Sequence, residues 1–159
     1  IKISDYLIYV LLATVCDVMP IRKLNRQIAL NALKTFDINK NLAFKELFNL
    51  NNKKNQLNIN DLGFLIGPIL NAGGRLGKSN YAADLLSSNN LTVINNKSNE
   101  LIKLNDKRKK IETSIINEID FQKINKENKN VIVYYNKNIN EGLIGIIASR
   151  LKDHFNKPS

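Results

Sequence analysis

The stretch GPILNAGGRLGKS, residues 67–79, carries residue types that can surround an anion. Glycine lets a backbone approach a ligand more closely than any other residue allows. Arg75 follows two consecutive glycines, so its guanidinium fork and nearby backbone amides could hold a phosphate together. The stretch therefore predicts a phosphate site. A helix–turn–helix corner that needs glycine for close packing is the structural alternative.

A nucleotide-binding loop is a second interpretation of the same stretch. Ala72, Gly77, Lys78 and Ser79 nearly satisfy the P-loop pattern, with alanine in place of its first glycine. A P-loop needs a buried strand before it, and Pro68 is a poor residue so close to the end of a central strand. The pattern therefore favours a nucleic-acid phosphate over a bound nucleotide.

Asp17 is a candidate metal ligand, because it follows the apolar run YLIYVLLATVC. A carboxylate buried after such a run is costly unless a cation or a metal pairs with it. In the alternative interpretation Asp17 lies beyond the end of the helix, in solvent. One carboxylate does not hold a magnesium or manganese ion alone, so further ligands would have to come from elsewhere.

The stretch NEGLIGIIASRL, residues 140–151, is the third candidate. Gly142 and Gly145 near a helix start could expose backbone amides, and Ser149 and Arg150 could reach a phosphate. A helix whose glycines only ease its packing on a sheet is an equally good explanation.

The elements that position these residues are expected to be mostly helical. Apolar spacing of three and four residues, ended by prolines and Asn-rich loops, predicts helices over residues 4–19, 22–36, 41–50, 61–67 and 98–124. The last of these would run about 40 Å and connect two lobes. The run VIVYY, residues 131–135, predicts the first strand, and a further helix follows it. A domain boundary is expected near residue 127.

Composition bounds the class of protein. The chain has 159 residues, of which 43% are apolar, and a net charge of +10. The charge suggests nucleic acid as a partner, although a Lys/Asn/Ile bias typical of AT-rich genomes also raises it. The arginines run against that bias and are better indicators: Arg22, Arg26, Arg75, Arg108 and Arg150. A single cysteine fits a reducing cytosolic setting, and no run is long enough to predict a membrane span.

Five stretches, taken in order, resemble one family. LLATVCDVMP, LNRQIAL, GPILNAGGRL, LNDKRKKIE and NEGLIGIIASRL are similar to the RecJ exonucleases of the DHH phosphoesterase superfamily. The resemblance implies an α/β fold of which this chain is a mostly α-helical internal piece. Residues 1–97 would be the C-terminal part of the DHH catalytic lobe, 98–126 a long connecting helix, and 127–159 the start of a DHHA1-type nucleic-acid-binding lobe.

The resemblance also implies an activity, a metal-dependent exonuclease that degrades single-stranded DNA from 5′ to 3′ in repair and recombination. It would use two manganese or magnesium ions, with Asp17 among the ligands and the DHH signature N-terminal to Ile1. Asn71, Gly74 and Arg75 would hold a DNA phosphate, with Ser149 and Arg150 as weaker strand contacts. The protein is expected to be a monomer in the bacterial cytoplasm and not to associate with a membrane. A helicase or a single-strand-binding protein is a possible partner.

The chain departs from the family pattern at four places. Ala13 and Gly73 replace a usual Gly and Ala, Ile69 replaces a usual Arg, and Ile139-Asn140 replaces a usual Trp-His pair. Two alternatives therefore stay open. One is another DHH phosphodiesterase that acts on short oligonucleotides or cyclic dinucleotides, and the other is a non-catalytic scaffold that binds single-stranded DNA. The chain alone, which carries one expected metal ligand, is not expected to cleave DNA.

Overall fold

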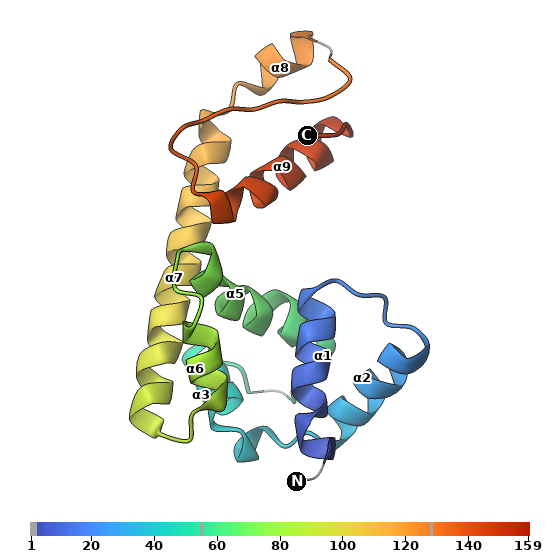
Figure 1. The fold of residues 1–159 in the computed structure, drawn as a ribbon, viewed down its shortest axis with the longest axis vertical. Helices are drawn as coiled ribbons and strands as arrows, with labels where there is room; N and C mark the ends of the chain where they lie inside the picture. The colour runs from blue at the N-terminus through green and yellow to red at the C-terminus, as the bar shows by residue number, and fades with distance from the viewer. Residues whose placement is uncertain (1–2, 55, 128) are drawn as a thin grey trace.

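The computed structural model describes residues 3–54, 56–127 and 129–159. The described chain is mostly α-helical, as expected (Figure 1). Its α-helices are α1 (Leu7–Cys16), α2 (Lys23–Thr35), α3 (Leu42–Leu50), α4 (Ile59–Asp61), α5 (Gly67–Arg75), α6 (Tyr81–Ser87), α7 (Leu91–Glu118), α8 (Phe121–Glu127) and α9 (Glu141–Phe155). Short 3₁₀ turns η1 (Ile3–Tyr6) and η2 (Ile38–Lys40) and a π-helical turn η3 (Leu62–Ile66) accompany them.

Helix α7 is the axis of the molecule, running beside α5, α6 and α9 in Figure 1. It begins seven residues before the expected start at residue 98, because the Asn90 side chain accepts hydrogen bonds from the amides of Thr92 and Val93. It also ends earlier than expected. Ile119 has extended backbone, and Asp120 caps α8 by accepting a hydrogen bond from the Lys123 amide. A competing cap therefore splits the predicted helix in two.

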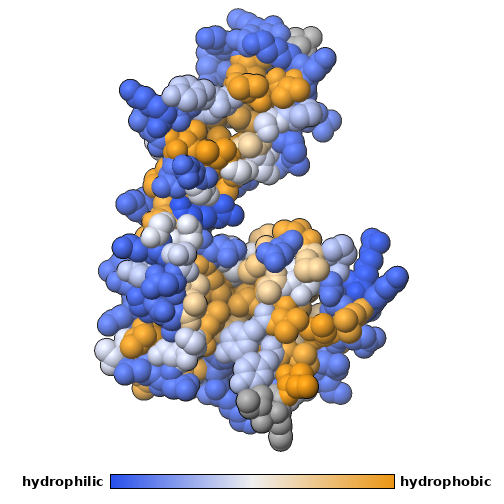
Figure 2. Space-filling model, viewed as in Figure 1, coloured by the Kyte–Doolittle hydropathy of each residue, from blue (hydrophilic) through white to orange (hydrophobic). Residues whose placement is uncertain are grey.

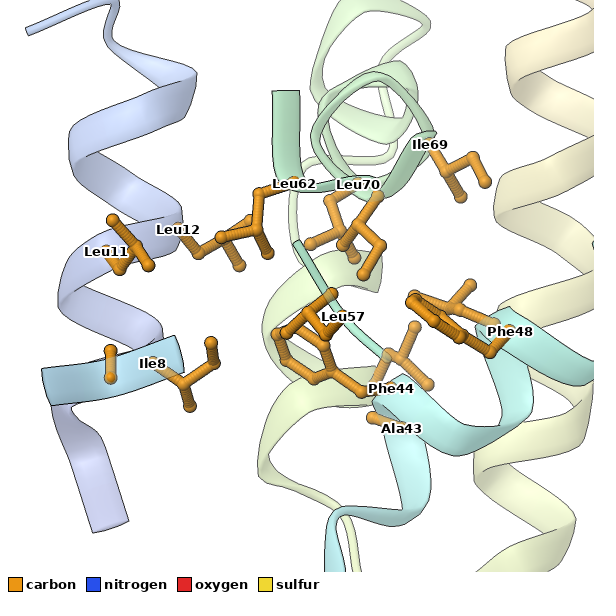
Figure 3. Close-up of a cluster of buried hydrophobic side chains, with 14 of the residues drawn as sticks. Ile8, Leu11, Leu12, Ala43, Phe44, Phe48, Leu57, Leu62, Ile69 and Leu70 are labelled. Carbon is orange, nitrogen blue, oxygen red and sulfur yellow. The ribbon is translucent and has the colours of Figure 1, made fainter. Parts of the chain in front are cut away.

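Two hydrophobic clusters pack against α7, one along its first half and one at its end. The larger cluster packs α1, α3 and α5 against the first half of α7, with Phe44 and Leu62 fully buried (Figure 3). The smaller cluster joins the end of α7 to α9, and its buried members are Ile115, Ile119, Ile132, Ile147 and Leu151. The chain thus forms a lower and an upper body that share one helix (Figure 1).

Pro68 does not interrupt the helical segment, contrary to the sequence prediction. Residues 59–75 form a continuous helical stretch in which the π turn η3 precedes α5, and Pro68 lies in the first turn of α5. A π turn changes the hydrogen-bond register, and the first turn of a helix does not need the amide that proline lacks. The prolyl ring is therefore accommodated without a break.

Residues 131–135 do not form the predicted strand. The segment has no regular secondary structure, and the Ile132 amide donates a hydrogen bond to the Pro158 carbonyl at 2.8 Å. Ile132 is buried while Val133 is 87% exposed, so the alternation of the predicted strand is kept. A strand needs a neighbouring strand for its ladder, and none of the described residues supplies one.

No described helix combines the length and apolar character that a bilayer crossing requires.

Candidate nucleic-acid interface

The glycine-rich stretch is a helix rather than a phosphate-binding loop. Asn71, Gly73, Gly74 and Arg75 all lie in α5, where backbone amides donate to carbonyls of the same helix. The turn comes only at Gly77, whose φ of 78° suits glycine, and the Lys78 amide closes it by bonding the Gly73 carbonyl at 2.7 Å. With a helix leading in and no free glycine loop, the P-loop interpretation is wrong.

A cleft of about 510 Å³ lies beside this helix. Figure 2 shows the hollow between the upper body, which holds α8 and α9, and the lower body. Residues four apart in a helix share one face, and three helices present such faces to the cleft: Gly67, Asn71 and Arg75 of α5, Arg108 and Glu112 of α7, and Gly145, Ser149 and Asp153 of α9. The end of α1 closes one side.

Four residues predicted from the sequence as phosphate contacts meet in this cleft. Asn71 and Arg75 come from α5, and Ser149 and Arg150 come from α9. Gly74 is exposed outside the lining, and its only possible contacts would be through backbone. The cleft therefore joins two stretches separated by some seventy residues, which no spacing rule in the sequence could have shown.

Arg75 also ties the two bodies together. Its Nη1 donates a hydrogen bond to the carbonyl oxygen of Gly142 at 2.9 Å, in the first turn of α9. A Cβ on Gly142 would collide with the backbone carbonyl of Arg75, so glycine is required for this approach. One nitrogen of the guanidinium is thus used within the protein, and the Arg75 side chain also lines the cleft.

Asp17 lies at the C-terminal cap of α1 and is exposed, as the alternative interpretation expected. The Met19 amide bonds the Thr14 carbonyl at 3.0 Å, which closes the turn with Val18 in the left-handed region at φ 54°. Cys16 and Val18, on either side of Asp17, line the cleft. The tight turn therefore holds the backbone of Asp17 beside the cleft.

The Cys16 thiol stays protonated at neutral pH. Burial raises its pKa, and the negative charge of Asp17 raises it further.

The described residues do not fit a two-metal centre by themselves. Nowhere in the described ranges do three His, Cys, Asp or Glu side chains gather as a metal site. Magnesium and manganese ions favour about six ligands, mostly oxygen. Asp17 can serve such an ion only together with ligands from outside these residues, and its role as a ligand stays a prediction.

Three charged residues of the cleft, Arg108, Glu112 and Asp153, were not singled out as site residues from the sequence. Arg108 donates to the Oε2 of Glu112 at 3.3 Å, and Arg150 donates to the Oε1 of the same carboxylate at 2.9 Å. Both Arg108 and Glu112 lie in the stretch LNDKRKKIE, which carries part of the family resemblance, and Arg108 was otherwise named only as one of the arginines behind the positive charge. Their four-residue spacing looks like an ordinary surface pair on a helix, and the contact with Arg150 exists only in the folded chain.

Two departures from the family pattern have structural roles. Ile69 is 2% exposed and packs in the larger hydrophobic cluster, so an apolar side chain is well suited to this position. The Asn140 side chain caps α9 by accepting a hydrogen bond from the Gly142 amide at 2.9 Å.

No protein-family model matches the chain. Curated relatives match its sequence along nearly all of its length. The single-stranded-DNA-specific exonuclease RecJ of Salmonella typhimurium is 33% identical over 164 residues, which cover 99% of this chain and 28% of that protein. The RecJ of Escherichia coli is 32% identical over the same shares. The RecJ of Bacillus subtilis is 30% identical over 93% of this chain and 19% of that protein.

Solved structures give the same result for the fold. RecJ from Thermus thermophilus in complex with Mn²⁺ superposes with a TM-score of 0.86 at 23% identity, over 97% of this chain and 23% of that chain. An exonuclease RecJ bound to manganese gives a TM-score of 0.79 at 22% identity, over 97% of this chain and 39% of that chain. The chain spans about 28% of the length of the Salmonella typhimurium relative. It is therefore a homologue of the RecJ exonucleases, matched along nearly all of its own length to a part of theirs.

Proposed function

We propose that this chain is the strand-holding part of a metal-dependent exonuclease that degrades single-stranded DNA from 5′ to 3′ in bacterial repair and recombination. The observation that carries the proposal is the cleft in which Asn71, Arg75, Ser149 and Arg150 meet. Guanidinium groups bind phosphates through paired, charge-assisted hydrogen bonds. Amide and hydroxyl side chains commonly add phosphate contacts of their own.

The charge of the cleft supports a ligand that is bound through its sugar–phosphate backbone. Three of the chain's five arginines line it, against the carboxylates of Glu112 and Asp153. Phosphate contacts carry no base information, so such a cleft would hold strands of any sequence and lose affinity steeply with salt.

Catalysis would need a longer protein. We propose that Asp17, at the edge of the cleft, contributes one oxygen ligand to a divalent manganese or magnesium ion whose other ligands lie outside residues 1–159. The 159-residue chain alone would then bind single strands without cleaving them.

The experiment uses the full-length protein with Mn²⁺ on 5′-labelled single-stranded and duplex DNA. We expect degradation of the single strand, and its loss in Asp17→Ala. Arg75→Ala should weaken single-strand binding roughly tenfold for all base sequences and lower the salt slope by about 1. Arg26→Ala, which removes an exposed arginine of α2 outside the cleft lining, is the matched control and should change little.

Other outcomes would replace the proposal. Unchanged affinity in Arg75→Ala would remove this arginine from the strand path. Binding without cleavage in the full-length protein would favour the scaffold. Cleavage confined to short oligonucleotides or cyclic dinucleotides would favour a different DHH phosphodiesterase.

A further inference from the structure

Glu112 is a nearly buried carboxylate shared by two arginines from two helices. Its side chain is 11% exposed, and each of its oxygens takes one arginine. Arg108 lies one turn earlier on α7, whereas Arg150 reaches it from α9, 38 residues later in the chain. A carboxylate at this depth would be costly without such partners, so the three side chains form one charged unit.

The two arginines are used differently in this unit. Arg108 is 14% exposed, and its remaining nitrogens, Nε and Nη2, donate to the Oδ1 of Asn105 at 3.3 and 3.2 Å. Arg150 gives Glu112 only its Nε and is 63% exposed. Among the described residues its terminal nitrogens make no hydrogen bond, so its outer edge is available to a ligand in the cleft.

We propose that Glu112 is a positioning residue for strand binding, and that it holds Arg150 by Nε so that Nη1 and Nη2 face a phosphate. This inference rests on the proposed function and deepens it. A free arginine side chain loses much rotamer entropy when it is fixed, and a guanidinium already anchored loses less on binding. Arg108 offsets the negative charge that Glu112 would otherwise set against the phosphate, and the unit keeps one net positive charge.

Removing the charge of Glu112 gives opposite signs for the two possible effects on binding. Glu112→Gln removes a negative charge beside the cleft, which by charge alone should tighten the binding of an anionic strand. Loss of positioning should instead weaken it. We expect Glu112→Gln in the full-length protein to bind a fluorescent oligothymidylate, in EDTA to prevent cleavage, about three- to tenfold more weakly. Glu118→Gln is the matched control, because it makes the same change on the same helix at an exposed site whose recorded partner is Ser114.

A double-mutant cycle separates positioning from general loss of structure. In an Arg150→Ala background, Glu112→Gln should cause no further loss of affinity, because the residue through which it acts is gone. Equal losses in both backgrounds, or tighter binding like that of a simple charge removal, would overturn the inference. If Arg150→Ala itself binds as well as the wild type, the proposed strand contact fails and the inference fails with it.

A second variant keeps the test valid if Glu112→Gln does not fold. Arg150→Lys changes a largely exposed side chain and keeps the charge, but one ammonium cannot hold Glu112 and present a two-pronged edge at once. We expect it to weaken binding at least about threefold. Affinity equal to that of the wild type would show that a point charge suffices and that Glu112 does not position it.

Discussion

Val18 carries the most unfavourable backbone conformation near the cleft. Its φ is 54° in the turn that ends α1, a position that glycine usually occupies. A β-branched residue in the left-handed region costs about 1–2 kcal/mol. Val18 is also 87% exposed, so little packing repays that cost. We expect Val18→Gly to raise the free energy of unfolding by about 0.5–1 kcal/mol, after glycine's larger unfolded-state entropy is subtracted, as measured by urea denaturation.

Two controls define this prediction. Val18→Ala keeps a Cβ and should gain less than Val18→Gly. Asn156→Gly, at the left-handed cap of α9, should change the free energy of unfolding by a smaller amount because asparagine tolerates this region. A loss of stability in Val18→Gly would show that the turn is not strained. A gain would mean that valine is kept beside Asp17 at a cost in stability.

At the scale of elements, α5 contains two adjacent glycines with opposite roles. A Cβ on Gly73 would lie 2.6 Å from the Lys78 carbonyl oxygen and 3.1 Å from a methyl group of Leu101, whereas a Cβ on Gly74 would meet nothing within 4 Å. We expect Gly73→Ala to lower the free energy of unfolding by about 1–3 kcal/mol through overpacking. Gly74→Ala should raise it by about 0.5–1 kcal/mol, because alanine favours the helix.

Strand binding by the same pair separates packing from function. Gly74→Ala tests whether the strand approaches this backbone, since the variant is expected to be more stable than the wild type. Weaker single-strand binding in a more stable protein would indicate close approach, as the family resemblance predicts. Equal stability losses in Gly73→Ala and Gly74→Ala, by thermal or urea unfolding, would contradict the packing of the turn at Lys78.

Local patterns in the sequence predicted local structure well. The apolar spacing of Leu101, Ile115 and Ile119 indicated the long helix, and the arginine of the glycine stretch pointed to the side of α5 that lines the cleft. Features that depend on competing helix caps or on partners distant in the chain could not be predicted from local patterns. Asp120 splits the predicted helix, and no ladder partner among the described residues turns residues 131–135 into a strand. The role of Glu112 is visible only in the folded chain, where α9 brings Arg150 into contact with it.

At the scale of the whole molecule, α7 contributes residues to both hydrophobic clusters. Leu101 belongs to the larger cluster, and Ile115 to the smaller one. The Arg75–Gly142 hydrogen bond adds a direct connection between the two bodies at the cleft, whereas the Glu112–Arg150 ion pair joins α7 to α9 within the upper body. Polar contacts of this kind add little compared with apolar burial. The two bodies are therefore expected to open locally with separate free energies.

Ile147→Ala tests this separation, because Ile147 is 2% exposed in the smaller cluster. Truncating it should cost about 2–5 kcal/mol by lost burial and a cavity, and the cost should fall on the upper body alone. Hydrogen exchange should then show faster exchange in α9 and the end of α7, with α1, α3 and α5 unchanged. Ile144→Ala, on the same helix but 54% exposed, should leave both bodies protected. If protection from hydrogen exchange fell equally in both bodies, α7 would make them one cooperative unit. The two sides of the cleft would then be held at a fixed separation as firmly as the hydrophobic clusters themselves.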